Sequence, residues 1–146
     1  RWPLAPLCPR RTEFALFSRT MMSRGLLMAV TEWGSAPNAP HVLLATTHLE
    51  SYVGPEANGD VLANRRSQLA EAGEKVARRA AEAQCCLAVL AGDMNWNDAD
   101  GGDPLEVLRA TAGGGGWRDA WQAVGGSLPR HLLDTPRHSL TLLDTS

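Results

Sequence analysis

Two apolar stretches, HVLLATTHLES at residues 41–51 and CLAVLAGDMN at residues 86–95, decide the fold of this chain. Each begins with β-branched and other apolar residues, typical of a strand covered on both faces, and each ends in polar side chains. The segment between them, residues 61–84, repeats its apolar positions at helical spacing. Strand, helix and strand in this order predict an α/β unit with two parallel strands in one sheet.

The segment between the two strands is expected to form one long surface helix. Its apolar face is marked by residues seven apart, namely Leu62, Leu69, Val76 and Ala83. Asp60 is the predicted N-cap, because its carboxylate can accept hydrogen bonds from the first free amides of the helix.

Two further elements and two irregular segments complete the predicted order. Residues 25–33 are apolar and predict another strand, and residues 104–110 suit a short helix. The glycine run 113–116 lacks the Lys-Ser or Lys-Thr of a phosphate-binding loop, so we expect a surface loop. Because three prolines occur in the first nine residues, residues 1–13 are expected to be an irregular lead-in, with structure beginning near Phe14.

Composition is that of an ordinary globular domain, with 146 residues, 44% hydrophobic and 21% charged. No apolar run approaches the roughly 18–20 residues that cross a bilayer, so we expect no membrane contact. The net charge of −2 provides no basic field, and any nucleic-acid contact must therefore be local. Three cysteines predict buried free thiols in a reducing compartment, and we expect a monomer.

Polar residues at the ends of the two strands are the candidates for chemistry. The carboxyl ends of parallel strands meet at one edge of a sheet, so His48 and Asp93 should lie close together. Asp93 can orient or deprotonate a water, Asn95 offers an amide, and Ser51 with His48 can donate to a phosphoryl oxygen. The alternatives are that Asp93 only caps a strand and that His48 is structural.

These motifs, in order, resemble those of the endonuclease/exonuclease/phosphatase superfamily. The matching segments are Thr47–Ser51, Arg65–Leu69 and Gly92–Asn95. Ser18–Arg24 and Asp119–Trp121 are most similar to the tyrosyl-DNA phosphodiesterase 2 subgroup. The resemblance implies part of a four-layer α/β sandwich, with residues 1–146 as the central portion of one domain.

The resemblance also implies a Mg²⁺ or Mn²⁺ cofactor and roles for individual residues. Asp93 would position and deprotonate the attacking water, Asn95 would hold a non-bridging oxygen, and His48 would stabilise the transition state. The residues expected to bind substrate are Glu50, Ser51, Arg65, Gln68, Trp96 and Asn97. For Arg65 and Gln68 the alternative is a solvated helix face.

The implied reaction is hydrolysis of 5′-phosphotyrosyl bonds, with DNA 5′ ends that carry a covalently attached protein or tyrosine as partners, in the nucleus or cytoplasm. The superfamily's glutamate metal ligand and its closing Ser-Asp-His are expected to lie outside this chain, which alone should be inactive or very weak. Val53 and the segment 140–145 depart from the subgroup, because an arginine and an aromatic residue are missing there. Abasic-site endonuclease, deadenylase, lipid or inositol phosphatase, and an inactive binding relic remain alternatives.

Overall fold

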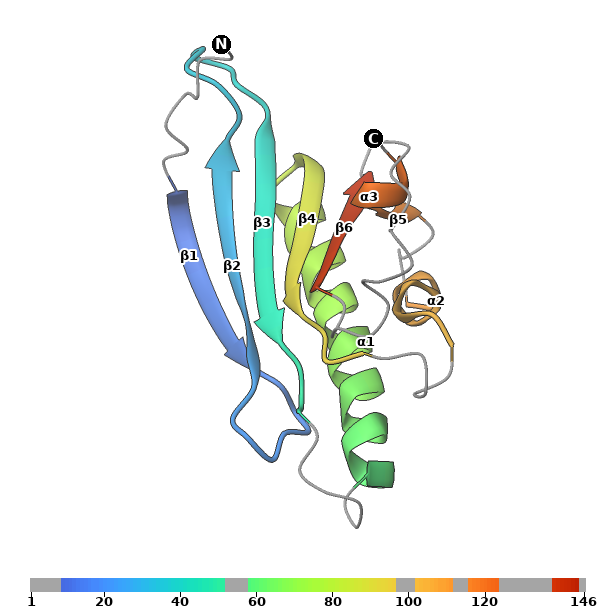
Figure 1. Cartoon of the computed structure of the whole chain (residues 1–146). Helices are drawn as coiled ribbons and strands as arrows, with labels where there is room; N and C mark the ends of the chain where they lie inside the picture. The colour runs from blue at the N-terminus through green and yellow to red at the C-terminus, as the bar shows by residue number, and fades with distance from the viewer. Residues whose placement is uncertain (1–8, 52–57, 97–101, 112–115, 124–137, 145–146) are drawn as a thin grey trace.

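One mixed sheet forms the centre of the molecule, and the long helix α1 lies along one of its faces (Figure 1). The structure is a computed structural model and describes residues 9–51, 58–96, 102–111, 116–123 and 138–144. In chain order the elements are β1 (Pro9–Leu16), β2 (Gly25–Glu32), β3 (His41–His48), α1 (Asn58–Glu82), β4 (Cys85–Asp93), α2 (Pro104–Arg109), β5 (Trp117–Asp119), α3 (Ala120–Ala123) and β6 (His138–Asp144).

The sheet has six strands in the order β1-β2-β3-β4-β6-β5. The strands β3 and β4 are parallel and are joined through α1, whereas the other neighbouring pairs are antiparallel. The predicted parallel pair, its crossover helix and the α/β class are therefore confirmed.

The hydrophobic core lies between the sheet and α1. Leu43 of β3 and Leu90 of β4 point to the same side as Leu26 of β2, and all three are fully buried. From α1, Leu69 and Val76 meet them and are also fully buried. Burial of one such side chain stabilises the fold by about 1.5–3 kcal/mol, so this face holds the helix in place.

The opposite face of the sheet is more exposed than the apolar runs predicted. Val42 is buried on that face, but Thr46 and His48 of the same strand are exposed. In the neighbouring strands Leu27 is 43% exposed and Phe14 61% exposed. The expectation that β3 is covered on both faces is thus wrong for the part of the chain that the structure describes, where helix covers one face.

Two predicted boundaries and one cysteine also differ from the structure. The strand β1 begins at Pro9 and not near Phe14, because proline is tolerated at the first residue of an edge strand. The helix α1 begins at Asn58, so Asp60 lies inside its first turn and is not the N-cap. Cys85 is buried, which raises the pKa of its thiol by desolvation, but Cys86 is exposed.

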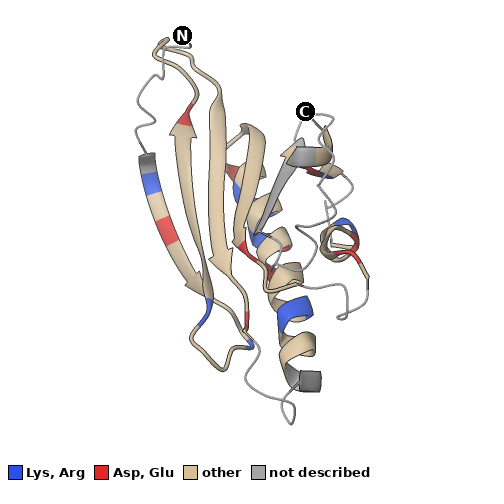
Figure 2. Cartoon of the chain, in the orientation of Figure 1, with Lys and Arg blue, Asp and Glu red and all other residues tan. Residues whose placement is uncertain are grey.

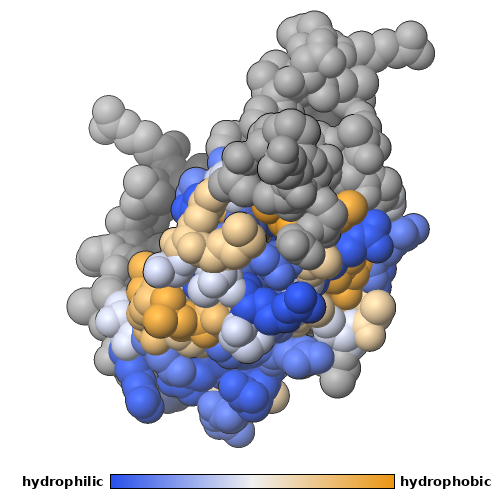
Figure 3. Space-filling view, turned by 90° about the horizontal axis from the view of Figure 1, so that it is seen from below, coloured by the Kyte–Doolittle hydropathy of each residue, from blue (hydrophilic) through white to orange (hydrophobic). Residues whose placement is uncertain are grey.

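Charged residues are dispersed over the described part of the chain and do not gather on one face (Figure 2). Within that part, no helix is both long and apolar enough to cross a membrane. Figure 3 shows the molecule from below, where hydrophilic residues dominate and hydrophobic ones are seen in separate groups.

Candidate functional site

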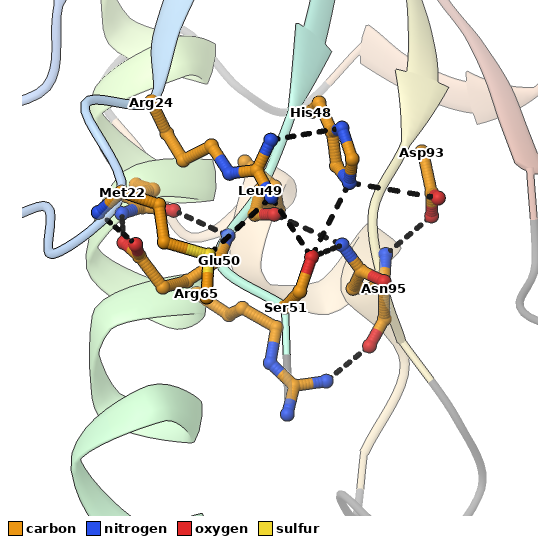
Figure 4. A network of polar contacts seen from close by, with 10 residues as sticks. Met22, Arg24, His48, Leu49, Glu50, Ser51, Arg65, Asp93 and Asn95 are labelled. Carbon is orange, nitrogen blue, oxygen red and sulfur yellow. Dashed lines mark hydrogen bonds and ion pairs between the residues drawn. The ribbon is translucent and has the colours of Figure 1, made fainter. Parts of the chain in front are cut away.

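His48 and Asp93 lie side by side at the carboxyl ends of β3 and β4. They are register partners in the parallel pair, and Nε2 of His48 is 3.7 Å from Oδ2 of Asp93 (Figure 4). Their side chains are 48% and 29% exposed, so both can reach a ligand. The prediction that the two residues meet at one sheet edge is confirmed.

A tight turn after β4 aims the carboxylate of Asp93. Oδ1 accepts a hydrogen bond of 2.9 Å from the backbone N–H of Asn95. Asn95 has a φ of +49°, a left-handed conformation that asparagine tolerates better than most residues. One carboxylate oxygen is therefore held by the turn, and the other is directed toward His48.

The side chain of Asn95 supports Ser51. Its Nδ2 donates to the carbonyl oxygen of Leu49 at 2.9 Å and to Oγ of Ser51 at 3.1 Å. Both hydrogens of the amide are thereby directed at acceptors of the protein. Asn95 consequently joins the two strand ends, which is a different arrangement from the predicted grip on a substrate oxygen.

Ser51 lies at the centre of the polar network shown in Figure 4. Its Oγ is 3.4 Å from Nε2 of His48 and accepts a 2.9 Å hydrogen bond from Nη2 of Arg24. The structure thus brings together four predicted residues, His48, Ser51, Asp93 and Asn95, within one set of contacts.

Arg24 is a site residue that sequence reasoning missed. It is the residue directly before β2, and its Nη1 lies 3.0 Å from Nδ1 of His48. The segment 18–24 served only as a family motif in the sequence, and no periodicity marks this arginine. An arginine directly before an apolar strand is the one available signal, and that signal is weak.

Glu50 and Gln68 are both fully buried and bond to groups of the protein, so their contact with a substrate stays a prediction. Oε1 of Glu50 accepts from the backbone N–H groups of Met21 at 3.0 Å and Met22 at 2.7 Å. Oε2 accepts from Nε2 of Gln68 at 2.5 Å, and that nitrogen also donates to the carbonyl of Arg19. The pair anchors the loop that carries Arg24, because buried polar groups must find partners inside the protein.

Arg65 and Trp96 also lie inside the protein, at 2% exposure each, and their predicted substrate contacts stay predictions. Nη1 of Arg65 donates to the carbonyl oxygen of Asn95, and Nε1 of Trp96 donates to that of Gly102. Both therefore brace the turn after β4. The remaining predicted substrate residue, Asn97, lies outside the described residues.

A second anchor holds the loop at its beginning. The carboxylate of Glu71 on α1 accepts from both the backbone N–H and the hydroxyl of Ser18, and pairs with Lys75 at 2.8 Å. Burial raises the pKa of Glu71, but the hydrogen bonds from Lys75 and Ser18 outweigh it, so the pKa is lowered overall. The loop between β1 and β2 is thus tied to α1 at its beginning, whereas Glu50, which follows β3, holds its middle.

Solved structures of other proteins share this architecture. No family model and no curated protein matches the chain. A humanized TDP2 of D. rerio superposes with a TM-score of 0.64 at 22% identity, covering 93% of this chain and 48% of that one. A truncated Caenorhabditis elegans TDP2 gives 0.64 at 18% identity, covering 94% and 53%. The chain has the endonuclease/exonuclease/phosphatase fold.

The same fold relates the chain to proteins with other names. The human Nocturnin catalytic domain superposes with a TM-score of 0.59 at 15% identity, covering 91% of this chain and 48% of that one. The chain spans about half the length of these solved structures. At such identities the likeness establishes the endonuclease/exonuclease/phosphatase fold alone.

Among the residues that the structure describes, the protein groups by themselves do not make a metal site. Across the described ranges, no three His, Cys, Asp or Glu side chains gather where they could hold an ion. Asp93 is the carboxylate that faces the site, since both oxygens of Glu50 are taken by protein donors. Mg²⁺ is usually bound by one or two carboxylates together with waters and substrate phosphate, and within the described ranges Asp93 is the one carboxylate that the site offers.

Proposed function

We propose that the site at the ends of β3 and β4 binds the phosphate of a phosphodiester and belongs to a phosphodiesterase. The observation that carries the proposal is the convergence of Oγ of Ser51, Nε2 of His48 and Oδ2 of Asp93. Two hydrogen-bond donors beside one carboxylate suit a reaction in which an oxyanion is stabilised and a water is deprotonated. The fold supports this class of chemistry.

In this proposal each residue acts through its observed position. Asp93 orients and deprotonates the attacking water through Oδ2, while the turn holds Oδ1. Ser51 and His48 donate to oxygens of the phosphate as negative charge develops on them. Asn95 keeps Ser51 in place. A divalent ion would require ligands beyond those described, so we assign no step to it.

We further propose that the substrate is DNA with a 5′-phosphotyrosyl end. With this substrate we expect the protein in the nucleus or cytoplasm. Two observations support this choice. Several TDP2 structures superpose on the chain, among them D. rerio TDP2 in complex with a single-strand DNA product. The loop Ser18–Arg24, which carries the motif of that subgroup, contributes Arg24 to the site.

Binding should distinguish this substrate from its relatives. We expect a short single-stranded oligonucleotide with a 5′-phosphotyrosine to bind at least about tenfold more tightly than the same oligonucleotide with a 5′-hydroxyl, since a hydrogen bond to a charged group contributes about 1.5–3 kcal/mol. Fluorescence anisotropy measures the difference. Ser51→Ala should abolish the preference, and Ser67→Ala on α1 should preserve it.

Two results of the same titration would contradict the proposal. Equal affinity for the two oligonucleotides would show that the site does not read the phosphate. Tighter binding of a sphingolipid headgroup or an inositol phosphate would mean that the substrate is of that class and not DNA. A sphingomyelinase C is among the solved structures that superpose on the chain.

Turnover by the 146-residue chain alone should be very low. With Mg²⁺ we expect release of tyrosine from the 5′-phosphotyrosyl oligonucleotide to stay within about tenfold of the Asp93→Asn variant, whereas a working general base contributes roughly 10²–10⁴-fold. The reason is that, among the described residues, Asp93 is the one carboxylate that faces the site. Glu74→Gln, an exposed change of carboxylate to amide, is the control. Robust Mg²⁺-dependent turnover would show that the chain holds a complete centre.

A further inference from the structure

The guanidinium of Arg24 contacts two groups of the site at once. Nη1 lies 3.0 Å from Nδ1 of His48, and Nη2 donates to Oγ of Ser51 at 2.9 Å. Arginine has no acceptor and is not deprotonated in proteins. In the first contact Arg24 must therefore be the donor, so Nδ1 of His48 is the acceptor and carries no proton.

We infer that Arg24 is a positioning residue that holds His48 as the neutral tautomer with its proton on Nε2. A neutral imidazole has one N–H and one bare nitrogen, and the partner of one nitrogen decides the state of the other. Nε2 is the nitrogen that faces Ser51 and Asp93. Arg24 thereby turns the site-facing nitrogen into a donor. The use of that donor for phosphate rests on the proposed function, but the tautomer does not.

Ser51 would otherwise compete with a ligand for His48. The lone pairs of its Oγ are already occupied by Nη2 of Arg24 and Nδ2 of Asn95, so the hydroxyl hydrogen remains to be donated. If Nε2 of His48 were bare, Ser51 would donate to it across 3.4 Å, and both groups would be consumed in one internal bond. With the proton on Nε2, each of them keeps a hydrogen for an external oxygen.

The arginine itself is held firmly in this place. Its backbone N–H donates to Oγ1 of Thr20 at 2.8 Å, and Nη2 also contacts Sδ of Met22 at 3.4 Å. Its Nε is buried and has no hydrogen-bond partner in the described part of the chain. An unpaired buried donor destabilises the fold, so this conformation is maintained by the anchored loop and not by the best local hydrogen bonding of the side chain.

Nitrogen NMR of the histidine rings tests the inference without any substrate. The chain, labelled with ¹⁵N in its four histidines, is recorded at a pH at which the rings are neutral, and His48 is assigned with a His48→Asn variant. Two-bond ¹H–¹⁵N correlations distinguish a protonated ring nitrogen from a bare one. We expect His48 to show a bare Nδ1 and a protonated Nε2, with no averaging between the two forms.

Variants of Arg24 make the cause visible. Arg24→Met keeps length without a donor, and the two ring nitrogens should shift toward averaged values as Ser51 begins to donate to Nε2. Arg24→Lys should retain the original pattern, because an ammonium can also only donate. Arg78→Met, on the exposed face of α1, is the control. The unmodified chain could show the expected tautomer of His48 and yet fail to prefer the 5′-phosphotyrosyl oligonucleotide. That result would contradict the proposed function and leave this inference standing.

A protonated Nδ1 in the unmodified chain would overturn the inference, and this result needs no variant to fold. An unchanged spectrum in a folded Arg24→Met protein would overturn it as well. Far-UV circular dichroism and the dispersion of the remaining NMR signals verify the fold of each variant.

Discussion

Replacing Gly92 with alanine should lower the free energy of unfolding by roughly 2–6 kcal/mol, combining a strained backbone conformation at about 1–3 kcal/mol with overpacking at about 1–3 kcal/mol. Gly92 has a φ of +147°, and a Cβ there would lie 1.9 Å from the carbonyl oxygen of Thr47 on the neighbouring strand. Backbone, unlike a flexible side chain, cannot turn away. Urea denaturation followed by circular dichroism measures the loss.

Gly34→Ala separates the two contributions. Gly34 also has a positive φ, of +118°, but the nearest atom to an added Cβ is Cβ of Ala39 at 3.9 Å. This variant should therefore show only the backbone term, about 1–3 kcal/mol. If the two substitutions destabilise equally, the close approach of β3 and β4 at Gly92 has no energetic consequence, and the steric argument fails.

The Gly92 variant should also disturb the site. His48 and Asp93 directly follow Thr47 and Gly92, the two residues whose backbones come close together. The register pairs Thr47 with Gly92 and His48 with Asp93. Separation of the strands at this point would lengthen the 3.7 Å distance between the two side chains. The glycine is thus required for the placement of the two residues as well as for the turn.

Glu50→Gln is expected to destabilise the fold by about 2–4 kcal/mol, because removing a buried acceptor from charge-assisted hydrogen bonds leaves donors unpaired. The carboxylate accepts from Met21, Met22 and Gln68 and is fully buried. A glutamine amide supplies one oxygen, so its NH₂ group must face another donor. Urea denaturation measures the change, with Glu74→Gln as the exposed control, expected within about 0.5 kcal/mol of the unmodified chain.

Hydrogen exchange should locate the damage. In Glu50→Gln the amides of Met21 and Met22 should exchange faster, because a neutral amide oxygen is a weaker acceptor than the carboxylate, while core amides of β3 follow only the global stability. Since the same loop carries Arg24, the tautomer pattern of His48 should also be lost. Unchanged exchange at Met21 and Met22 would mean that the buried carboxylate does not hold the loop.

Much of the fold could be predicted because the interactions that specify it are local in sequence. The apolar runs ending at His48 and at Asp93, with an amphipathic segment between them, leave a parallel pair with a crossover helix as the simple solution. Register then follows from the shared core face, and it makes His48 and Asp93 neighbours. The start of β1 was missed because Pro9 belongs to an edge strand, where a missing N–H has no cost.

The roles of individual site residues were less predictable. Glu50, Gln68 and Arg65 are of residue types that are usually exposed, and the family resemblance predicted that they contact substrate. Their burial depends on how α1 packs beside the loop after β1, which places Gln68 against Glu50 across 18 residues of sequence. Such contacts carry no periodicity, and no local pattern distinguishes an anchoring carboxylate from a catalytic one.

The sequence by itself determined that His48 and Asp93 would end adjacent parallel strands, because strand periodicity and connection rules act over short segments. Only the tertiary structure decided what surrounds them. It brought Arg24 within 3.0 Å of His48, held the arginine through the buried Glu50, and directed the amide of Asn95 at Ser51. Arrangements of this kind are set by packing between distant segments, and hydrogen bonds then select the state of each group.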